Sequence, residues 1–431
     1  MPGDAVPAVL PPLAGFPPVR GRKPAAYRAP NRGSARDRED RRGGSGWAAG
    51  GAGRRGGNFT QLGARLLLSP VVPLVLVEFD ATKTSVGLAL TGMWAVYALL
   101  QFPSGVLADR YGEYRLVLAG LVGTAVGAVL VATAPSLLAY GLFALVLGAG
   151  GGLFFSPASS LLSRLFDAQG EALGSLTAGG SVAGVAFPAV ASFVAVRFGW
   201  RPAVALGALV AVPVAVVTVR SVPRLPPVTP DRRLRSVLDA GLILDLLGRP
   251  AVLYSTLLAV LLGFTFQAFS SFFPTFLVEY RGLATDTAGL AFAAVFGLSA
   301  LAQPVAGRIS DRASRDVVIA GSVILAGAGF AVLLFVPGLA GMLVGAALLG
   351  VGVSWPGPVQ ARLMDQFEEA ERGFGFGLVR TTYMLLAASG STVVGLLADG
   401  GGWPLAYGAV VGLLACCLLA LALNRAVESG L

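Results

Sequence analysis

The chain has 431 residues, of which 55% are hydrophobic and only 13% are charged, and its mean hydropathy is +0.75. Soluble domains usually carry about 25% charged residues, so this composition excludes an ordinary soluble protein and indicates a membrane protein. The sequence contains no histidine, no phosphate-binding loop of the G-x-x-x-x-G-K type and no metal-ligand cluster. A nucleotide-driven pump, a metal- or triad-dependent enzyme and a bound cofactor are therefore not expected.

Residues 1–58 differ in composition from the rest. They contain twelve glycines, eight prolines and eleven of the 32 basic residues, against four acids. Such a segment is typical of low-complexity disorder. It is interpreted as a cytoplasmic tail, either an unstructured extension or a basic segment that contacts anionic lipid or nucleic acid. The first interpretation is favoured, and no nucleic-acid partner is expected.

Apolar runs of the length that crosses a bilayer follow in regular succession. The sequence predicts helices at about 62–79, 86–108, 116–134, 137–162, 172–196 and 202–220, and again at about 252–279, 287–307, 317–337, 340–361, 373–397 and 403–424. The polar, proline-rich stretch 221–250 separates the two sets. It is predicted to link an N-terminal bundle, residues 59–220, to a C-terminal bundle, residues 251–431.

The turn between the second and third helices carries an eleven-residue motif, G-V-L-A-D-R-Y-G-E-Y-R. Its fixed positions are small or charged: Gly105, Asp109, Arg110, Gly112 and Arg115. Glycine lets two helices approach closely, and an acid can interact with the positive N-terminus of another helix. The motif is therefore interpreted as a gate between helices.

A second, weaker copy of this motif lies 202 residues later. Gly307, Asp311 and Arg312 occupy the positions of Gly105, Asp109 and Arg110, while Ser314 and Val317 replace Gly112 and Arg115. Further pairs recur at offsets of 201 and 203, namely Glu78 with Glu279 and Gly199-Trp200 with Gly402-Trp403. The chain is thus predicted to consist of two parallel copies of one half.

The motif resembles the loop 2–3 signature of the major facilitator superfamily, G-x-x-x-D-R-x-G-x-x-R. The resemblance implies an all-α membrane protein with twelve transmembrane helices arranged as two six-helix bundles related by a parallel repeat. It further implies alternating access, with Asp109 meeting the N-terminus of helix 11 near Gly373, and with Arg110 or Arg115 pairing with Asp167 or Glu171.

The distribution of basic residues predicts the orientation. With both termini in the cytoplasm, sixteen basic residues after the tail, Arg65 among them, fall on the cytoplasmic side, against Lys83, Arg197, Arg201 and Arg281 outside. A monomer in the cell membrane, with both termini cytoplasmic, is expected.

The resemblance implies that helices 1, 4, 7 and 10 face a central cavity, with contributions from 2, 5, 8 and 11. The polar and aromatic candidates for substrate binding on these helices are Trp94, Tyr97, Gln267, Trp355, Gln360, Arg380 and Tyr383. Gln267 stands among phenylalanines that form either a cavity wall or ordinary packing.

Arg380 is predicted to lie about 10 Å along helix 11 at about 1.5 Å per residue. A charge at such depth is costly and usually serves a function. Two interpretations are open: a guanidinium that binds a substrate carboxylate or oxyanion with help from Tyr383, or an arginine that reaches back to water.

Glu78 and Glu279 lie at the outer ends of helices 1 and 7, where they act either as gate or proton-coupling groups or as polar caps. Two family patterns are absent. Ala144 stands where many proton-coupled members have an arginine, and Gly184 and Pro188 are separated where drug–proton antiporters have a Gly-Pro pair.

The sequence therefore predicts a non-enzymatic secondary transporter of a small organic or inorganic anion. Export of hydrophobic or drug-like compounds and a non-transporting sensor on the same fold are the alternatives. The substrate, the direction of transport and any coupling proton or ion stay open.

Overall fold

The computed structural model describes residues 56–166, 169–230, 240–368 and 371–426. The helices are α3 (Leu68–Glu78), α4 (Lys83–Tyr111), α5 (Glu113–Ala132), α6 (Leu137–Leu165), α7 (Gln169–Phe198), α8 (Trp200–Ser221), α9 (Ala240–Gly248), α10 (Pro250–Glu279), α11 (Thr285–Arg312), α12 (Arg315–Phe335), α13 (Gly338–Gly352), α14 (Pro356–Asp365), α15 (Arg372–Ala387) and α16 (Gly390–Ala426). The described residues contain no strand.

Eleven helical stretches are long and apolar enough to cross a membrane, and the last of them, Gly375–Ala426, has 52 residues. Its backbone leaves the helical conformation at Gly402, where φ is 76°, so it comprises two spans. The described residues therefore contain twelve spans, which confirms the predicted fold class. The tenth span consists of α13 and α14, which are separate because Pro356 and Pro358 cannot continue the hydrogen-bond ladder of α13.

The first span begins earlier than the sequence predicts. It runs Gly56–Glu78, so residues 56–58, expected at the end of the tail, are its first residues. The Thr60 hydroxyl donates to the Gly56 carbonyl (2.7 Å), and the Asn58 amide donates to the carbonyl of Leu176 on α7 (2.9 Å). Residues 1–55 lie outside the described part of the chain.

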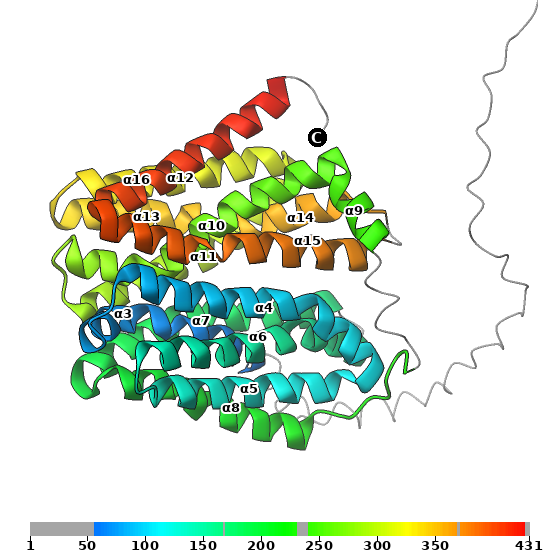
Figure 1. Cartoon of the computed structure of the whole chain (residues 1–431). Helices are drawn as coiled ribbons and strands as arrows, with labels where there is room; N and C mark the ends of the chain where they lie inside the picture. Colours follow the sequence, from blue (N-terminus) through cyan, green and yellow to red (C-terminus); the bar gives the residue numbers. More distant parts are fainter. Residues whose placement is uncertain (1–55, 167–168, 231–239, 369–370, 427–431) are drawn as a thin grey trace, which may run out of the picture. The chain divides into compact units, whose positions relative to one another are not determined.

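The helices pack as two groups joined by a few helix pairs (Figure 1). Within the first group α6 packs against α4 and α5, and within the second α12 packs against α13 and α16. The main contacts between the groups pair α4 with α15 and α16, α7 with α11, and α3 with α10. Residues at the middle of α4, α6 and α15 can therefore meet at the boundary between the groups.

The repeat inferred from the sequence has a structural counterpart. Gly199 and Gly402 both adopt positive φ, at 88° and 76°, immediately before a tryptophan. The indole nitrogen of Trp200 donates to Glu78, and that of Trp403 donates to Glu279. Each half thus fixes the carboxylate at the end of its first helix with the tryptophan that begins its last one.

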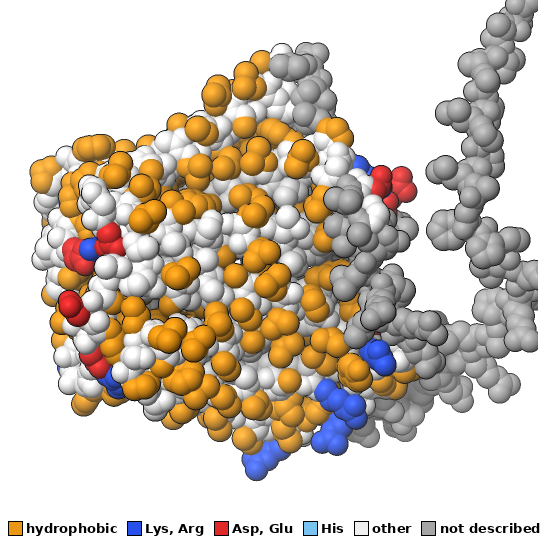
Figure 2. Space-filling view, in the orientation of Figure 1, with side chains coloured by type: hydrophobic (Ala, Val, Ile, Leu, Met, Phe, Trp, Pro, Cys, Tyr) orange, Lys and Arg blue, Asp and Glu red, His pale blue; other side chains and the backbone are white. Residues whose placement is uncertain are grey.

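Apolar side chains cover most of the face in Figure 2, whereas charged side chains gather at the two ends of the helices. Leu138, Leu301 and Phe335 are between 73% and 76% exposed. Exposed apolar surface of this extent is unfavourable in water but is what a lipid-facing belt requires.

Candidate functional site

Arg65 lies near the middle of the first span, nine residues after its start at Gly56 and thirteen before its end at Glu78. Only 4% of its surface is exposed. The prediction that Arg65 belongs to the cytoplasmic side was wrong. It failed because the helix was expected to begin near residue 62, which would have placed this arginine in the first turn.

The guanidinium of Arg65 lies against two aromatic rings of α4. Its Cζ is 4.2 Å from the ring centroid of Tyr97 and 5.1 Å from that of Trp94, and these two rings meet edge to face. Both aromatics were predicted from the sequence to line a binding site. Cation–π contacts contribute about 0.5–2 kcal/mol each, which offsets only part of the cost of burying the charge.

A glycine of α6 makes the space that the guanidinium occupies. A Cβ at Gly151 would overlap Nη1 of Arg65 and lie 2.9 Å from its Cζ. The glycines of α6 therefore have two uses. A Cβ at Gly148 would overlap the backbone carbonyl of Met93 on α4, whereas Gly151 accommodates a charged side chain.

Arg380 of α15 approaches the same region from the second group of helices. Its Cζ is 4.7 Å from the ring centroid of Phe155 on α6, four residues beyond Gly151. Tyr383, one turn further along α15, interacts electrostatically with both Arg380 and Tyr97. Arg380 thus extends across the boundary toward α6, which favours the interpretation of an arginine within the interior over one that reaches back to water along α15.

Several buried side-chain N–H groups in this region have no hydrogen-bond acceptor. Nε and Nη1 of Arg65 and Nε of Arg380 have no hydrogen-bond partner, and neither guanidinium forms an ion pair among the described residues. The amide nitrogens of Gln61 and Gln101, each one turn from a residue of the site, are also unpaired. A region rich in free N–H groups and poor in acceptors is suited to an anion.

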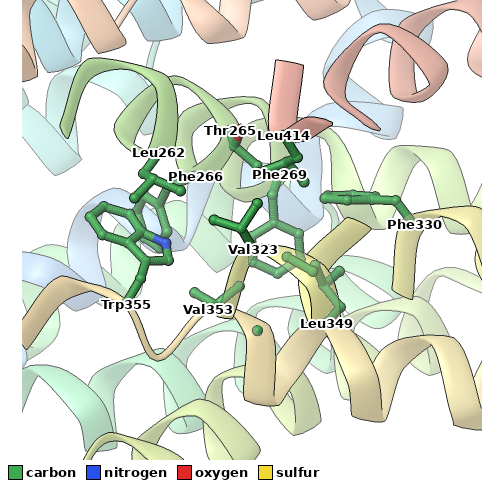
Figure 3. A pocket seen from close by; sticks show the side chains of 12 residues that line it. Leu262, Thr265, Phe266, Phe269, Val323, Phe330, Leu349, Val353, Trp355 and Leu414 are labelled. Carbon is green, nitrogen blue, oxygen red and sulfur yellow. The ribbon is translucent and has the colours of Figure 1, made fainter. Parts of the chain in front are cut away.

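Three other predicted site residues are not brought into this group. Gln267 is buried, and its side-chain oxygen accepts from Ser270 on the same helix (3.3 Å). Gln360 is exposed on α14. Trp355 lies beside a small apolar pocket within the second group, with Leu262, Phe266 and Val353 around it (Figure 3).

The phenylalanines near Gln267 pack against one another. Phe269, Phe272, Phe273 and Phe276 are each at most 1% exposed, and the Phe269 ring lies 4.9 Å from that of Phe273 and 5.3 Å from that of Phe292. Of the two interpretations given to these residues, packing within the second group is the one that the geometry supports.

A charged network joins the two groups at the end of the helices that carries Glu78 and Glu279, here called the lock end. Nζ of Lys83 lies 3.1 Å from Glu279 and 3.8 Å from Asp399. The backbone nitrogen of Thr84 also donates to Asp399 (2.8 Å). Nearby, Thr91 hydrogen-bonds to Thr392 (2.7 Å), and the Ser69 hydroxyl donates to the carbonyl of Ser271 (3.2 Å), so this end is closed in the structure.

Glu78 and Glu279, predicted as coupling groups or caps, therefore differ in their partners. Glu78 pairs with Arg201 of its own half, whereas Glu279 pairs with Lys83 of the other half. Glu279 is therefore the one of the two whose ion pair joins the halves. The sequence could not indicate this pairing, because Lys83 and Glu279 are 196 residues apart.

The opposite end carries the Gly105–Arg115 motif and is here called the motif end. Gly112 has a φ of 94°, which only glycine adopts readily, and it connects α4 to α5. The carbonyl of Asp109 accepts from the nitrogen of Thr229 in the linker (2.9 Å). The predicted contact of Asp109 near Gly373 and the predicted pairing of Arg110 or Arg115 with Asp167 or Glu171 fall on side chains outside the described part and stay predictions.

The sequence did not predict an ion pair that one residue of the motif, Glu113, forms with α6. The carboxylate of Glu113 is fully buried and accepts two hydrogen bonds of 2.7 Å from Arg164 on α6. The second half repeats this arrangement, because Asp316 at the start of α12 pairs with Arg362 of α14. In the weaker motif copy Asp311 pairs with Arg315, and its side chain is 70% exposed.

Near the motif end, a second cavity of about 580 Å³ lies between the start of the first span and α7, lined by Gly56, Phe59, Gly174, Ser175, Ala178, Gly179 and Val182. These residues carry no charge, so the cavity offers space without a fixed ligand preference.

Comparison with known proteins supports the fold and the broad class. The family model described as Major Facilitator Superfamily matches residues 56–297 and 256–430. The chain is similar to the hexuronate transporter of Bacillus subtilis, at 23% identity over 66% of this chain and 71% of the relative. It is also similar to the fosmidomycin resistance protein of Escherichia coli, at 26% identity over 60% and 64%.

Among solved structures, the nucleoside transporter NupG is similar over 86% of this chain and 99% of its own, with a TM-score of 0.73 and 14% identity. At that identity the likeness concerns the fold alone. Together with the family match, it accounts for the helices and the repeat in one architecture.

Proposed function

The chain belongs to the Major Facilitator Superfamily, and we propose that it is a secondary transporter that moves a small anion by alternating access. The observation that carries the proposal is the pair of guanidiniums inside the helix bundle, that of the buried Arg65 and that of the half-buried Arg380, with no carboxylate partner among the described residues. A buried unpaired charge is costly to retain, and an anionic substrate would compensate it during each transport cycle.

The position of the pair supports a transport role. Arg65 belongs to the first group of helices and Arg380 to the second, and the two approach α6 from opposite sides of the boundary. An anion held by both would contact both moving halves, so that its binding energy could favour one arrangement of the halves over the other. The similarity to a hexuronate transporter, whose named substrate is a carboxylate, agrees with this substrate class.

In this proposal the lock end and the motif end open in turn. The lock end is closed here by Lys83, Glu279 and Asp399. Each such partly exposed pair contributes about 0.2–1 kcal/mol, which is small enough to break during a transport cycle. With Arg65 removed from the cytoplasmic count, fifteen basic residues still face four, so we place the motif end and both termini in the cytoplasm of a cell-membrane protein.

Uptake by proteoliposomes tests the proposal. The purified full chain is reconstituted and offered an equimolar mixture of D-glucuronate, succinate, glucose and uridine, and the vesicle contents are measured by mass spectrometry. Accumulation of an anion above that in protein-free vesicles, lost in Arg65→Gln and Arg380→Gln, is the expected result. Arg308→Gln, which removes an exposed arginine of α11, is the matched control and should transport normally.

Uptake of only the neutral solutes would contradict the proposal, as would anion uptake that both arginine variants retain. A hydrophobic compound added to the same mixture tests the alternative. Its export, with no anion moved, would favour the alternative of a hydrophobic, drug-like substrate.

A further inference from the structure

The two guanidiniums contact successive turns on one face of α6. Arg65 occupies the space at Gly151, and Arg380 lies over the ring of Phe155. Residues four apart in a helix lie on the same face, about 6 Å along its axis. Two positive charges are therefore presented along one short stretch of helix rather than at separate sites.

A single negative charge cannot balance this arrangement. Arg65 is 4% exposed and lacks partners at Nε and Nη1, and Arg380 lacks one at Nε. The remaining neighbours are Trp94, Tyr97, Phe155 and Tyr383, which carry no formal negative charge at neutral pH. A monoanion at either arginine would leave the other one, the buried Arg65 or the half-buried Arg380, unpaired and near a like charge, which is unfavourable at low dielectric.

We propose that the anion bound between Arg65 and Arg380 is a small dianion, with its two charged groups about one helical turn apart. Each guanidinium takes one of the charged groups through its fork of N–H donors. The aromatic rings enclose the short apolar stretch between these groups. A short dicarboxylate such as succinate is the simplest member of this class. The inference rests on the proposed function, because it specifies the substrate class of that same site.

The test compares succinate with a monoanion of the same size, succinamate, and with a larger monoanion, D-glucuronate. The melting temperature of the purified full chain is measured at constant chloride with increasing succinate, with succinamate, its monoamide, and with D-glucuronate. A ligand that binds only the folded protein raises its melting temperature according to its affinity. We expect succinate to act at a concentration at least about tenfold lower than either monoanion, which corresponds to one additional charged contact.

The variants Arg65→Gln and Arg380→Gln should each abolish the preference for succinate over succinamate. Arg65→Lys and Arg380→Lys keep the charges and should retain part of that preference, and they serve as the readout if a glutamine variant fails to fold.

The outcomes separate this inference from the proposed function. Equal increases in melting temperature with succinate, succinamate and glucuronate, seen only when both arginines are present, would overturn the dianion inference. That result would still agree with an anion transporter. A preference for succinate that persists in both glutamine variants would place dianion binding elsewhere and would also overturn the inference. No effect of any anion on the parent protein would overturn both proposals together.

Discussion

Gly151→Ala tests the site without removing any of its charged groups. The added Cβ would overlap Nη1 of Arg65 and would lie 2.9 Å from its Cζ and 3.1 Å from Cδ2 of Tyr97, whereas ordinary contacts begin at 3.4 Å. The atoms in the way belong to side chains, not to backbone, so the guanidinium can move aside. The backbone of α6 and its contact with α4 should stay in place.

The expected effect is a loss of affinity at normal stability. Displacing the guanidinium removes one charge-assisted hydrogen bond to the substrate, which contributes about 1.5–3 kcal/mol, so the apparent KM for anion uptake should rise about tenfold to hundredfold. Alanine is favoured over glycine inside a helix by about 1 kcal/mol. The melting temperature of the substrate-free protein should therefore be unchanged or higher.

Two other glycines of the same helix provide controls. A Cβ at Gly141 would meet Cβ of Ala89 at an ordinary 3.5 Å, so Gly141→Ala should leave KM unaltered and the melting temperature unchanged or higher. Gly148→Ala would overlap the backbone carbonyl of Met93 and should lower the melting temperature. If Gly151→Ala behaves like Gly148→Ala, with lost stability, or like Gly141→Ala, with an unchanged KM, then Gly151 does not position Arg65 for binding.

Three further predictions concern other parts of the chain. Arg380→Gln should abolish anion uptake into proteoliposomes. Arg380→Lys should raise the KM for uptake, because lysine keeps the positive charge but lacks the paired N–H donors of the guanidinium. Uptake by the glutamine variant with an unaltered KM would leave Arg380 a structural residue. Asp109→Asn should lower the uptake rate more than Asp311→Asn at equal membrane insertion, since Asp311 pairs within an exposed, degraded motif copy; a larger effect of Asp311→Asn would reverse this ranking. Hydrogen bonds from Arg249 hold the pKa of Glu371 below its usual range. The pair therefore stabilises the protein at pH values above the ordinary pKa of a carboxylate, and this stabilisation is lost as the pH falls through the lowered pKa. Glu371→Gln should thus lower the melting temperature at neutral pH and match the parent protein in strong acid, and a difference that persists in acid would exclude this linkage.

The sequence was sufficient to predict the helices and the repeat, because both depend on patterns that can be seen in the sequence itself. Apolar length gives the twelve spans, and the matched pairs Glu78/Glu279 and Trp200/Trp403 indicated the two halves that the structure shows. Arg380 was found for the same reason, since a charge several turns into an apolar run is visible without a structure.

Arg65 was misplaced because its interpretation depended on where one helix begins. Gly56 and Gly57 follow a glycine-rich tail and resemble it in composition, yet they form the first turn of the span. Phe59 and Leu62 continue the apolar periodicity backward from Leu66 and were the signal that could have located the start. The six missed residues, nearly two helical turns, are enough to move an arginine from the interface to the interior.

Contacts between distant segments could not be predicted from local patterns. Lys83 meets Asp399 across 316 residues, and Glu113 meets Arg164 across 51. The sequence around each residue does not indicate its partner, because each pairing depends on how whole helices pack. The phenylalanines near Gln267 illustrate the same difficulty, since their spacing suits a cavity wall and a packed core equally well.

Anion uptake by Arg65→Gln proteoliposomes tests the central claim most directly. Arg65 has no hydrogen-bond or ion-pair partner among the described residues, so the substitution breaks no such contact and relieves a buried charge. The account predicts that the variant inserts and melts at or above the temperature of the parent protein, while anion uptake falls to the level of protein-free vesicles. Uptake at the parent rate by a stably folded Arg65→Gln variant would contradict it.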